Sequence, residues 1–176
     1  MSQVLAFANP ASRTGKTTSA SRLCLELAGR GVTVLAIDMD PRAELTRAFG
    51  IDAGSLTQSM HEVLLAGLDP RELLHDTDFG VDVMPAAPEL SLAEGLLFGR
   101  PGRESVLRAA LEPLRHQYET IVIDCPSSLG LLTLNAIAAA DELVIPGVGS
   151  QTRADAALLR AADEIRQFVN PGLVIR

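Results

Sequence analysis

The chain has 176 residues, of which 47% are hydrophobic, 21% are charged and 3% are aromatic, and its formal net charge is −7. This length and composition predict one globular domain with an aliphatic core, and the negative charge argues against a surface coated in positive charge for nucleic acid. We expect no secretion signal and no membrane-spanning segment. Cys24 and Cys125 lack a metal-like spacing, so we expect two buried, reduced thiols.

Short apolar segments alternate with helical ones along the chain. In chain order we predict a strand at 3–8, a helix at 16–29, a strand at 32–38, helices at 43–49, 56–66 and 69–75, a strand at 81–86, helices at 91–99 and 102–117, a strand at 120–124, a helix at 131–140, a strand at 142–147, a helix at 152–169 and the start of a sixth strand at 172–176. Apolar strands that alternate with helices predict a three-layer α/β/α fold with a mainly parallel central sheet. We expect 1–176 to form a single domain that is C-terminally truncated, because the sixth strand only begins.

The segment NPASRTGKTT (9–18) connects the first predicted strand to the first predicted helix. Its second half is typical of a phosphate-binding loop, in which Lys16 reaches the β- and γ-phosphates and the Thr17 hydroxyl binds Mg²⁺. The strict glycine spacing of such loops fails, because Pro10 stands where the first glycine belongs. A helix N-terminus with no special role remains the alternative for this segment alone.

Carboxylates end two of the predicted strands. Asp38 and Asp40 follow the second strand, and Asp124 ends the fourth. Because ligands bind at the carboxyl ends of parallel strands, these side chains are expected to face the phosphate site, where a carboxylate can hold Mg²⁺ through water. The alternatives are a helix cap for Asp40, which leaves Asp38 unexplained, and a plain strand end for Asp124.

Three ordered segments resemble the ParA/MinD family of P-loop ATPases with a deviant Walker A loop, in its ParA branch. They are 11–18 (ASRTGKTT), 38–46 (DMDPRAELT) and 124–130 (DCPSSLG), and 131–146 also resembles that branch. The family typically has K-G-G-x-G-K-T-T in the first segment and D-x-D-P-Q-x-x-x-T in the second. The resemblance covers nearly the whole chain and implies the P-loop NTPase fold.

The resemblance also implies roles for individual residues. The loop that holds the nucleotide would consist of Ser12, Arg13, Thr14, Gly15, Lys16, Thr17 and Thr18. Asp40 would orient or activate the attacking water, and Lys16 would assist catalysis. Thr17 would bind the metal, with Asp38 and Asp124 supporting the metal and its waters.

The first lysine of the family loop crosses a dimer and contacts the partner's phosphates. Ala11 stands at that position here, so the resemblance implies weak hydrolysis unless another cation takes this role. Arg13 and Arg153 are two candidates, of which we favour Arg153 because Arg13 occupies a glycine position. The alternative is that both arginines are merely solvated. Phosphate binding is expected to survive better than hydrolysis, because Ser12 and Arg13 keep their backbone N–H groups.

The resemblance implies an ATPase that uses ATP and Mg²⁺ and forms a homodimer on ATP binding, as a switch for DNA partition or cargo positioning. It implies weak activity that an adaptor protein stimulates, a cytoplasmic location with nucleoid association as a variant, and no membrane partner. The net charge leaves nonspecific DNA binding open. The alternatives are a nucleotide-binding interaction protein without hydrolysis and an ATP-dependent ligase, against which the ParA-like stretch 124–146 argues.

Overall fold

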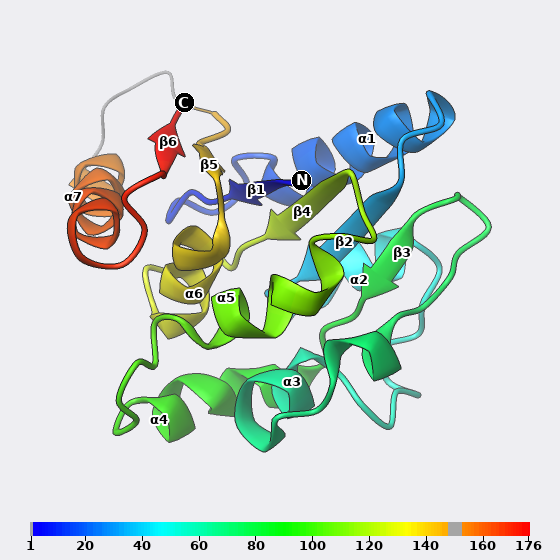
Figure 1. The fold of residues 1–176 in the computed structure, drawn as a ribbon, viewed down its shortest axis with the longest axis horizontal. Helices are drawn as coiled ribbons and strands as arrows, with labels where there is room; N and C mark the ends of the chain where they lie inside the picture. Colours follow the sequence, from blue (N-terminus) through cyan, green and yellow to red (C-terminus); the bar gives the residue numbers. More distant parts are fainter. Residues whose placement is uncertain (1, 148–152) are drawn as a thin grey trace.

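The computed structural model describes residues 2–147 and 153–176, and its centre is a six-stranded sheet (Figure 1). The strands are β1 (Gln3–Phe7), β2 (Val34–Asp38), β3 (Asp82–Met84), β4 (Thr120–Asp124), β5 (Glu142–Val144) and β6 (Val174–Ile175). Their order across the sheet is β3-β2-β4-β1-β5-β6, and every neighbouring pair is parallel. The prediction of a mainly parallel sheet is therefore confirmed.

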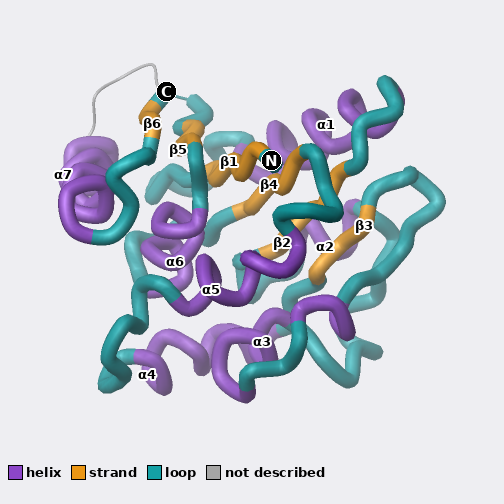
Figure 2. Tube along the Cα trace, viewed as in Figure 1, coloured by secondary structure: helices purple, strands orange, loops and turns teal. Residues whose placement is uncertain are grey.

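Helices cover both faces of the sheet (Figure 2). The α-helices are α1 (Lys16–Gly29), α2 (Glu44–Ala48), α3 (Met60–Ala66), α4 (Ala93–Leu97), α5 (Val106–Leu111), α6 (Leu131–Ala139) and α7 (Arg153–Phe168). Three 3₁₀ turns are η1 (Pro70–Leu73), η2 (Pro88–Leu92) and η3 (Glu112–Leu114). Of these helices, α1 and α2 pack on one face, and α3, α5 and α6 pack on the other.

The strands are apolar on both faces because both faces are covered. In β2, Leu35 and Ile37 belong to the core under α3, α5 and α6, whereas Val34 and Ala36 belong to the smaller core under α1 and α2. This alternation follows from the two-residue period of a strand. No helix in the described part of the chain has the length and apolar character needed to cross a bilayer.

The parallel register brings the predicted acidic residues to one edge of the sheet. Asp38 of β2 lies opposite Asp124 of β4, and Phe7 at the end of β1 lies opposite Asp124 from the other side. The chain leaves β1 at this edge, forms a loop and enters α1 at Lys16. The three strands therefore end around the start of α1, as expected for a ligand site in a parallel α/β fold.

Several predicted helices are shorter than their sequence pattern indicated. The predicted helix at 102–117 forms α5 over six residues and then the turn η3, because Pro113 cannot continue the α-helical hydrogen bonds. The segment 69–75 forms only a 3₁₀ turn after Asp69, whose side chain accepts a hydrogen bond from the backbone of Arg71. The helix predicted at 56–66 begins at Met60, where Ser59 and Glu62 form a capping box.

Candidate functional site

The loop between β1 and α1 is held at its start by the side chain of Asn9. Asn9 Oδ1 accepts a hydrogen bond from the backbone N–H of Ala11 at 2.9 Å, and Asn9 Nδ2 donates to the carbonyl of Pro146 at 2.8 Å. The backbone at Gly147 also lies close to the loop, since a Cβ there would lie 3.2 Å from the carbonyl oxygen of Thr14. The loop is thus fixed against the segment that follows β5.

Two loop residues have a left-handed backbone. Gly15 has φ +80°, which costs a glycine nothing, and it lies directly before α1. Arg13 has φ +60°, a conformation that costs a residue with a Cβ about 1–2 kcal/mol relative to glycine. Arg13 therefore does adopt the glycine-type backbone that its position in the loop requires.

The first turn of α1 presents backbone N–H groups that are capped by no side chain among residues 2–147 and 153–176. Four N–H groups at the start of a helix have no partner within the helix, and together with the helix dipole they attract anions. Thr17 and Thr18 lie in this first turn, and the Thr17 hydroxyl is directed at Asp124, at the carboxyl edge of the sheet. The helix start can therefore accept an anion with a metal beside it.

Lys16 is almost fully buried, with 5% of its surface exposed. Its ammonium group donates to Ser127 Oγ at 2.7 Å and to the carbonyl of Ala11 at 3.4 Å. Burial lowers the pKa of Lys16, and the positive charge of Arg42 lowers it further, against the raising effect of Asp124. An anion beside this amine would offset the cost of burying its charge.

Thr17 and Asp124 form the contact between α1 and the end of β4. Thr17 Oγ1 donates to Asp124 Oδ2 at 2.6 Å. Within the described residues, Asp124 Oδ1 is buried and has no hydrogen-bond partner. Burial raises the pKa of the Asp124 carboxyl to about 8, and the nearby Asp38 and Asp40 raise it while the Thr17 hydrogen bond lowers it. This pair fits a divalent cation, which would stabilise the ionised carboxylate and accept the unused oxygen, directly or through water.

Asp38 is fully buried and its carboxylate is occupied by local donors. Its Oδ1 accepts from the backbone of Asp40, and its Oδ2 accepts from both the backbone N–H and the hydroxyl of Thr46. Burial raises the pKa of Asp38 to about 6, although these hydrogen bonds lower it. Because these bonds join residues 40 and 46, the arrangement supports a positioning role; metal support by Asp38 stays a prediction.

Asp40 is held by the arginine two residues further on. Arg42 Nη2 and Nε donate to Asp40 Oδ2 at 2.8 and 3.1 Å, and the Arg42 backbone donates to Asp40 Oδ1 at 2.9 Å. The Arg42 guanidinium also donates to Ser127 Oγ at 3.2 Å and lies 3.6 Å from the carboxylate of Glu44. Asp40 is therefore connected to the candidate site by Arg42, which lies at that site.

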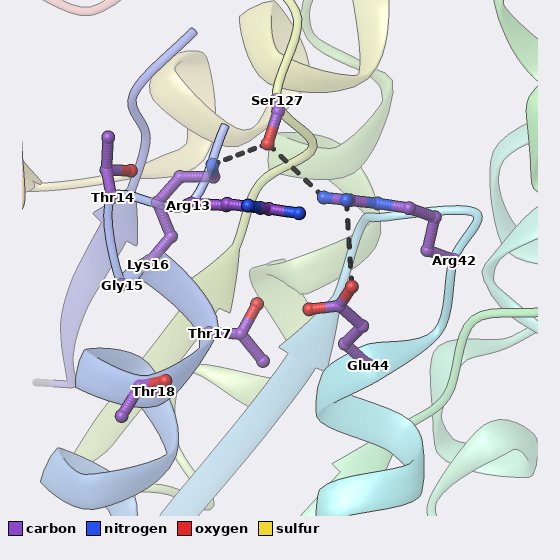
Figure 3. Close-up of a pocket in the computed structure, with 9 residues that line it drawn as sticks. All are labelled: Arg13, Thr14, Gly15, Lys16, Thr17, Thr18, Arg42, Glu44 and Ser127. Carbon is purple, nitrogen blue, oxygen red and sulfur yellow. Dashed lines mark hydrogen bonds and ion pairs between the residues drawn. The ribbon is translucent and has the colours of Figure 1, made fainter. Parts of the chain in front are cut away.

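These segments enclose a cavity of about 480 Å³ (Figure 3). It is lined by Arg13, Thr14, Gly15, Lys16, Thr17, Thr18, Arg42, Glu44 and Ser127. Arg13 and Arg42 extend into it from opposite sides. Three cationic side chains and one carboxylate give the lining a net positive charge, and the volume is in the range of small-molecule sites. The cavity is suited to a polyanion such as a chain of phosphates.

Most of the predicted loop residues line this cavity. Three other residues line it that lie in 40–46 and 124–130, the two segments that the resemblance implies would sense the γ-phosphate. Ser12 is exposed and does not line the cavity. The side chain of Arg153, at the start of α7, lies outside what the structure describes. Arg42, Glu44 and Ser127 were expected only as parts of these segments and were not singled out individually. Arg42 had a signal of its own, a positive charge where the D-x-D-P-Q pattern has glutamine. Ser127 and Glu44 had no signal that separates them from the other residues of the same segments.

Sequence comparisons identify relatives over most of the chain. A sequence model of the AAA domain family matches residues 2–175. The chromosome partitioning protein ParA of Myxococcus xanthus is 39% identical over 174 residues, which cover 97% of this chain and 62% of the relative. The sporulation initiation inhibitor protein Soj of Bacillus subtilis is 38% identical over 147 residues, which cover 83% of this chain and 58% of the relative. The chain thus spans less than two thirds of the length of either relative.

A solved structure agrees closely with the fold described above. The crystal structure of cobyrinic acid a,c-diamide synthase from Mycobacterium smegmatis with bound ADP and magnesium matches with a TM-score of 0.95 at 38% identity, over 99% of this chain and 72% of that one. The same protein is also known with an ATP analogue and magnesium. Together with the family match over residues 2–175, these relatives confirm the resemblance seen in three sequence segments: the chain belongs to the ParA/Soj family of P-loop ATPases.

Proposed function

We propose that the chain binds ATP with Mg²⁺ in the cavity at the start of α1 and acts as a ParA-type switch. The observation that carries this proposal is the Thr17–Asp124 contact, which leaves a buried carboxylate oxygen unused beside an uncapped helix start. The Mycobacterium smegmatis structures, which hold ADP or an ATP analogue with magnesium, support the same assignment.

The residues would divide the work along the phosphate chain. The backbone N–H groups from Gly15 to Thr18 would hold phosphate oxygens, and Lys16 would neutralise charge on the outer phosphates. Thr17 and Asp124 would hold the metal, Thr17 directly and Asp124 through its unused oxygen or a water. Bound Mg²⁺ would supply a positive charge that stabilises the phosphoryl group in transfer.

Asp40 is the candidate for orienting the attacking water, and Asp38 positions it through the backbone of residue 40. Because Ala11 provides no charge, we propose that turnover is slow on its own and that a partner protein stimulates it. Arg13 and Arg153 remain the candidates for a cation that crosses a dimer. In this proposal, ATP joins two copies of the chain and hydrolysis separates them, for DNA partition or cargo positioning in the cytoplasm.

Calorimetry with Mg²⁺ and a nonhydrolysable ATP analogue tests the binding step. Lys16→Ala is expected to weaken binding at least about 100-fold, because the amine loses its contact with the outer phosphates. Arg71→Ala, at an exposed arginine away from the cavity, is the matched control and should bind like the wild type. Equal affinity in wild type and Lys16→Ala would contradict the proposal.

Light scattering tests the dimer step. The wild type should double in mass with the ATP analogue and remain smaller with ADP, and Arg13→Ala and Arg153→Ala compare the two candidate cations. If both variants dimerise like the wild type, neither arginine is the crossing cation. A wild type that stays the same size with both nucleotides would contradict the switch.

Two other functions share the nucleotide site. An interaction protein that binds ATP without hydrolysis is favoured by Ala11, and it predicts no phosphate release with any partner or DNA. An ATP-dependent amide-forming enzyme is favoured by the likeness to cobyrinic acid a,c-diamide synthase. It predicts ATP consumption only when a carboxylic acid and an ammonia source are added.

A further inference from the structure

Arg42 makes more contacts at the site than an ordinary surface arginine. Its side chain is 54% exposed, yet both oxygens of the Asp40 carboxylate, whose side chain is 4% exposed, accept hydrogen bonds from it. The same guanidinium reaches across to Ser127, which is 85 residues away in the sequence. Arg42 therefore connects the segment after β2 to the segment after β4.

Ser127 Oγ is the point where two cations converge. The Lys16 ammonium donates to this oxygen at 2.7 Å and the Arg42 guanidinium donates to it at 3.2 Å. A neutral hydroxyl has two lone pairs for these donors but no charge to offset two positive groups. A phosphate oxygen near this point would accept from both donors and would also supply the missing negative charge. The geometry is thus prepared for an anionic oxygen.

The Arg13 guanidinium adds a third positive charge from the other side of the cavity. Arg13 and Arg42 extend toward one another across the cavity in Figure 3. Glu44, at 3.6 Å from Arg42, is the single carboxylate among the described residues that line the cavity. Cations gathered in this way repel one another until an anion lies between them, so the outer end of the cavity favours the most highly charged ligand.

We propose that Arg42 is the residue that distinguishes a nucleoside triphosphate from a diphosphate, by moving from Asp40 to the terminal phosphate. This inference rests on the proposed function and names the group that responds to the third phosphate. The long, half-exposed side chain of Arg42 can make this move while its backbone stays bonded to Asp40. A diphosphate, which lacks the terminal group, leaves Arg42 on Asp40.

The same move of Arg42 determines whether the carboxylate oxygens of Asp40 are free to accept hydrogen bonds from a water. While Arg42 holds both carboxylate oxygens, few lone pairs of Asp40 are directed at a water in the cavity. When the terminal phosphate takes the guanidinium, these lone pairs become available to orient a water beside that phosphate. Arg42 is thus a contact residue for the triphosphate and a positioning residue for Asp40.

Calorimetry of the full chain with Mg·ADP and with a nonhydrolysable Mg·ATP analogue tests the inference. Arg42→Gln is expected to weaken binding of the analogue at least about tenfold and to leave ADP affinity within about twofold. Arg42→Lys should keep part of the preference for the triphosphate, because it retains the charge without the planar fork. Arg71→Gln, in a second Asp-Pro-Arg segment whose arginine makes the same contacts with its own aspartate, should change neither affinity.

A double-mutant cycle with Asp40→Asn separates the move of Arg42 from simple charge repulsion. If Asp40 competes for Arg42, Asp40→Asn raises affinity for the analogue in the wild-type background and has little effect in the Arg42→Gln background. An equal gain in both backgrounds would contradict the competition. The thermal unfolding of each variant is measured alongside, so that loss of folding is not read as loss of binding.

The outcomes separate this inference from the function on which it rests. A wild type that binds neither nucleotide overturns both. A wild type that binds both nucleotides, with Arg42→Gln weakening them equally or weakening neither, overturns the role of Arg42 alone. A selective loss of triphosphate affinity in Arg42→Gln, with partial rescue in Arg42→Lys, supports the inference.

Discussion

The tripeptide Asp-Pro-Arg occurs twice in this chain, at 40–42 and at 69–71, with the same local hydrogen bonds. In both copies the arginine side chain donates to both oxygens of the aspartate two residues earlier, and its backbone N–H donates to the same carboxylate. The ion pair is therefore a property of the tripeptide. It does not identify a functional site by itself.

The two copies differ in what surrounds them. The Asp69 side chain is 33% exposed and its segment continues into the 3₁₀ turn η1. The Asp40 side chain is 4% exposed, and the chain after Arg42 turns through Ala43, which has a left-handed backbone at φ +53°. Only the first copy lies at the carboxyl edge of the sheet, beside Lys16. The position of the first copy in the fold, and not its local hydrogen bonds, therefore places it at the candidate nucleotide site.

The largest expected difference between the copies is in turnover. Asp40→Asn should reduce phosphate release from ATP about 100-fold, because the amide no longer orients or activates the water. Asp69→Asn should release phosphate at the wild-type rate. Phosphate release is measured at saturating ATP and Mg²⁺ for all three proteins. Equal rates in wild type and Asp40→Asn would remove Asp40 from the reaction.

The next difference is in stability. Arg42→Ala should destabilise the nucleotide-free chain by about 2–3 kcal/mol, since it leaves the buried Asp40 carboxylate without its cation. Arg71→Ala should cost clearly less than Arg42→Ala, because an exposed pair is screened by solvent. Urea unfolding of the two variants gives both values. Similar losses in the two variants would mean that burial of Asp40 matters little to the ion pair.

A third difference concerns the direction of pH dependence. The hydrogen bond from Arg71 lowers the pKa of Asp69 to about 2, whereas burial raises the pKa of Asp124 in the cavity to about 8, against an ordinary value of 3.8. The stabilisation of the folded chain by Asp69 is present above about pH 4 and is lost as the pH falls toward 2. The stabilisation of the folded chain by the protonated Asp124 carboxyl is present below about pH 4 and is lost as the pH rises through 8.

Urea unfolding between pH 5 and pH 8 measures this contrast. Relative to Asp124→Asn, the wild type should lose up to about 1.4 kcal/mol of unfolding free energy for each pH unit. Asp69→Asn should stay parallel to the wild type over the same range. Parallel curves for wild type and Asp124→Asn would show that the Asp124 carboxyl is ionised throughout.

The smallest expected effect concerns Arg13, opposite Arg42 in the cavity. Arg13→Gly should be more stable than Arg13→Ala by about 0.5–1 kcal/mol, because glycine adopts φ +60° freely but gains more entropy on unfolding. Both variants lose the same charge, so thermal unfolding of the two isolates the backbone term. A more stable Arg13→Ala would mean that the loop relaxes away from the left-handed conformation.

The sequence allowed most of the fold to be predicted where local pattern decides the structure. The helix at 16–29 and the strand at 120–124 have the predicted bounds, because apolar runs and a glycine-terminated helix carry their own signals. The helix predicted at 102–117 is wrong in length, since its apolar spacing covers only two turns and Pro113 ends it. The apolar spacing alone could not show where the helix ends, because the end depends on Pro113 and on how α5 packs.

The candidate site divides in the same way. Lys16 and Thr17 were predicted from the loop between the first strand and the first helix, and Gly15 and Thr18 from the family resemblance of that loop, because a phosphate loop is a local structure. The contact of Arg42 with Ser127 depends on β2 and β4 being neighbours in the sheet, and no spacing in the sequence encodes that adjacency. The ion pair of Arg42 with Asp40 is local, but its second copy at 69–71 shows why it could not be recognised as functional.

The central claim is that Lys16 and Arg42 together receive the terminal phosphate, and the sequence offers a direct probe of it. Lys16 is the only lysine among the 176 residues, so isotope labelling of lysine gives a single side-chain signal in NMR spectra. We expect Mg·ADP to move this signal, a nonhydrolysable Mg·ATP analogue to move it further, and Arg42→Gln to remove the difference between the two nucleotides. A Lys16 signal that stays in place with both nucleotides would contradict the account.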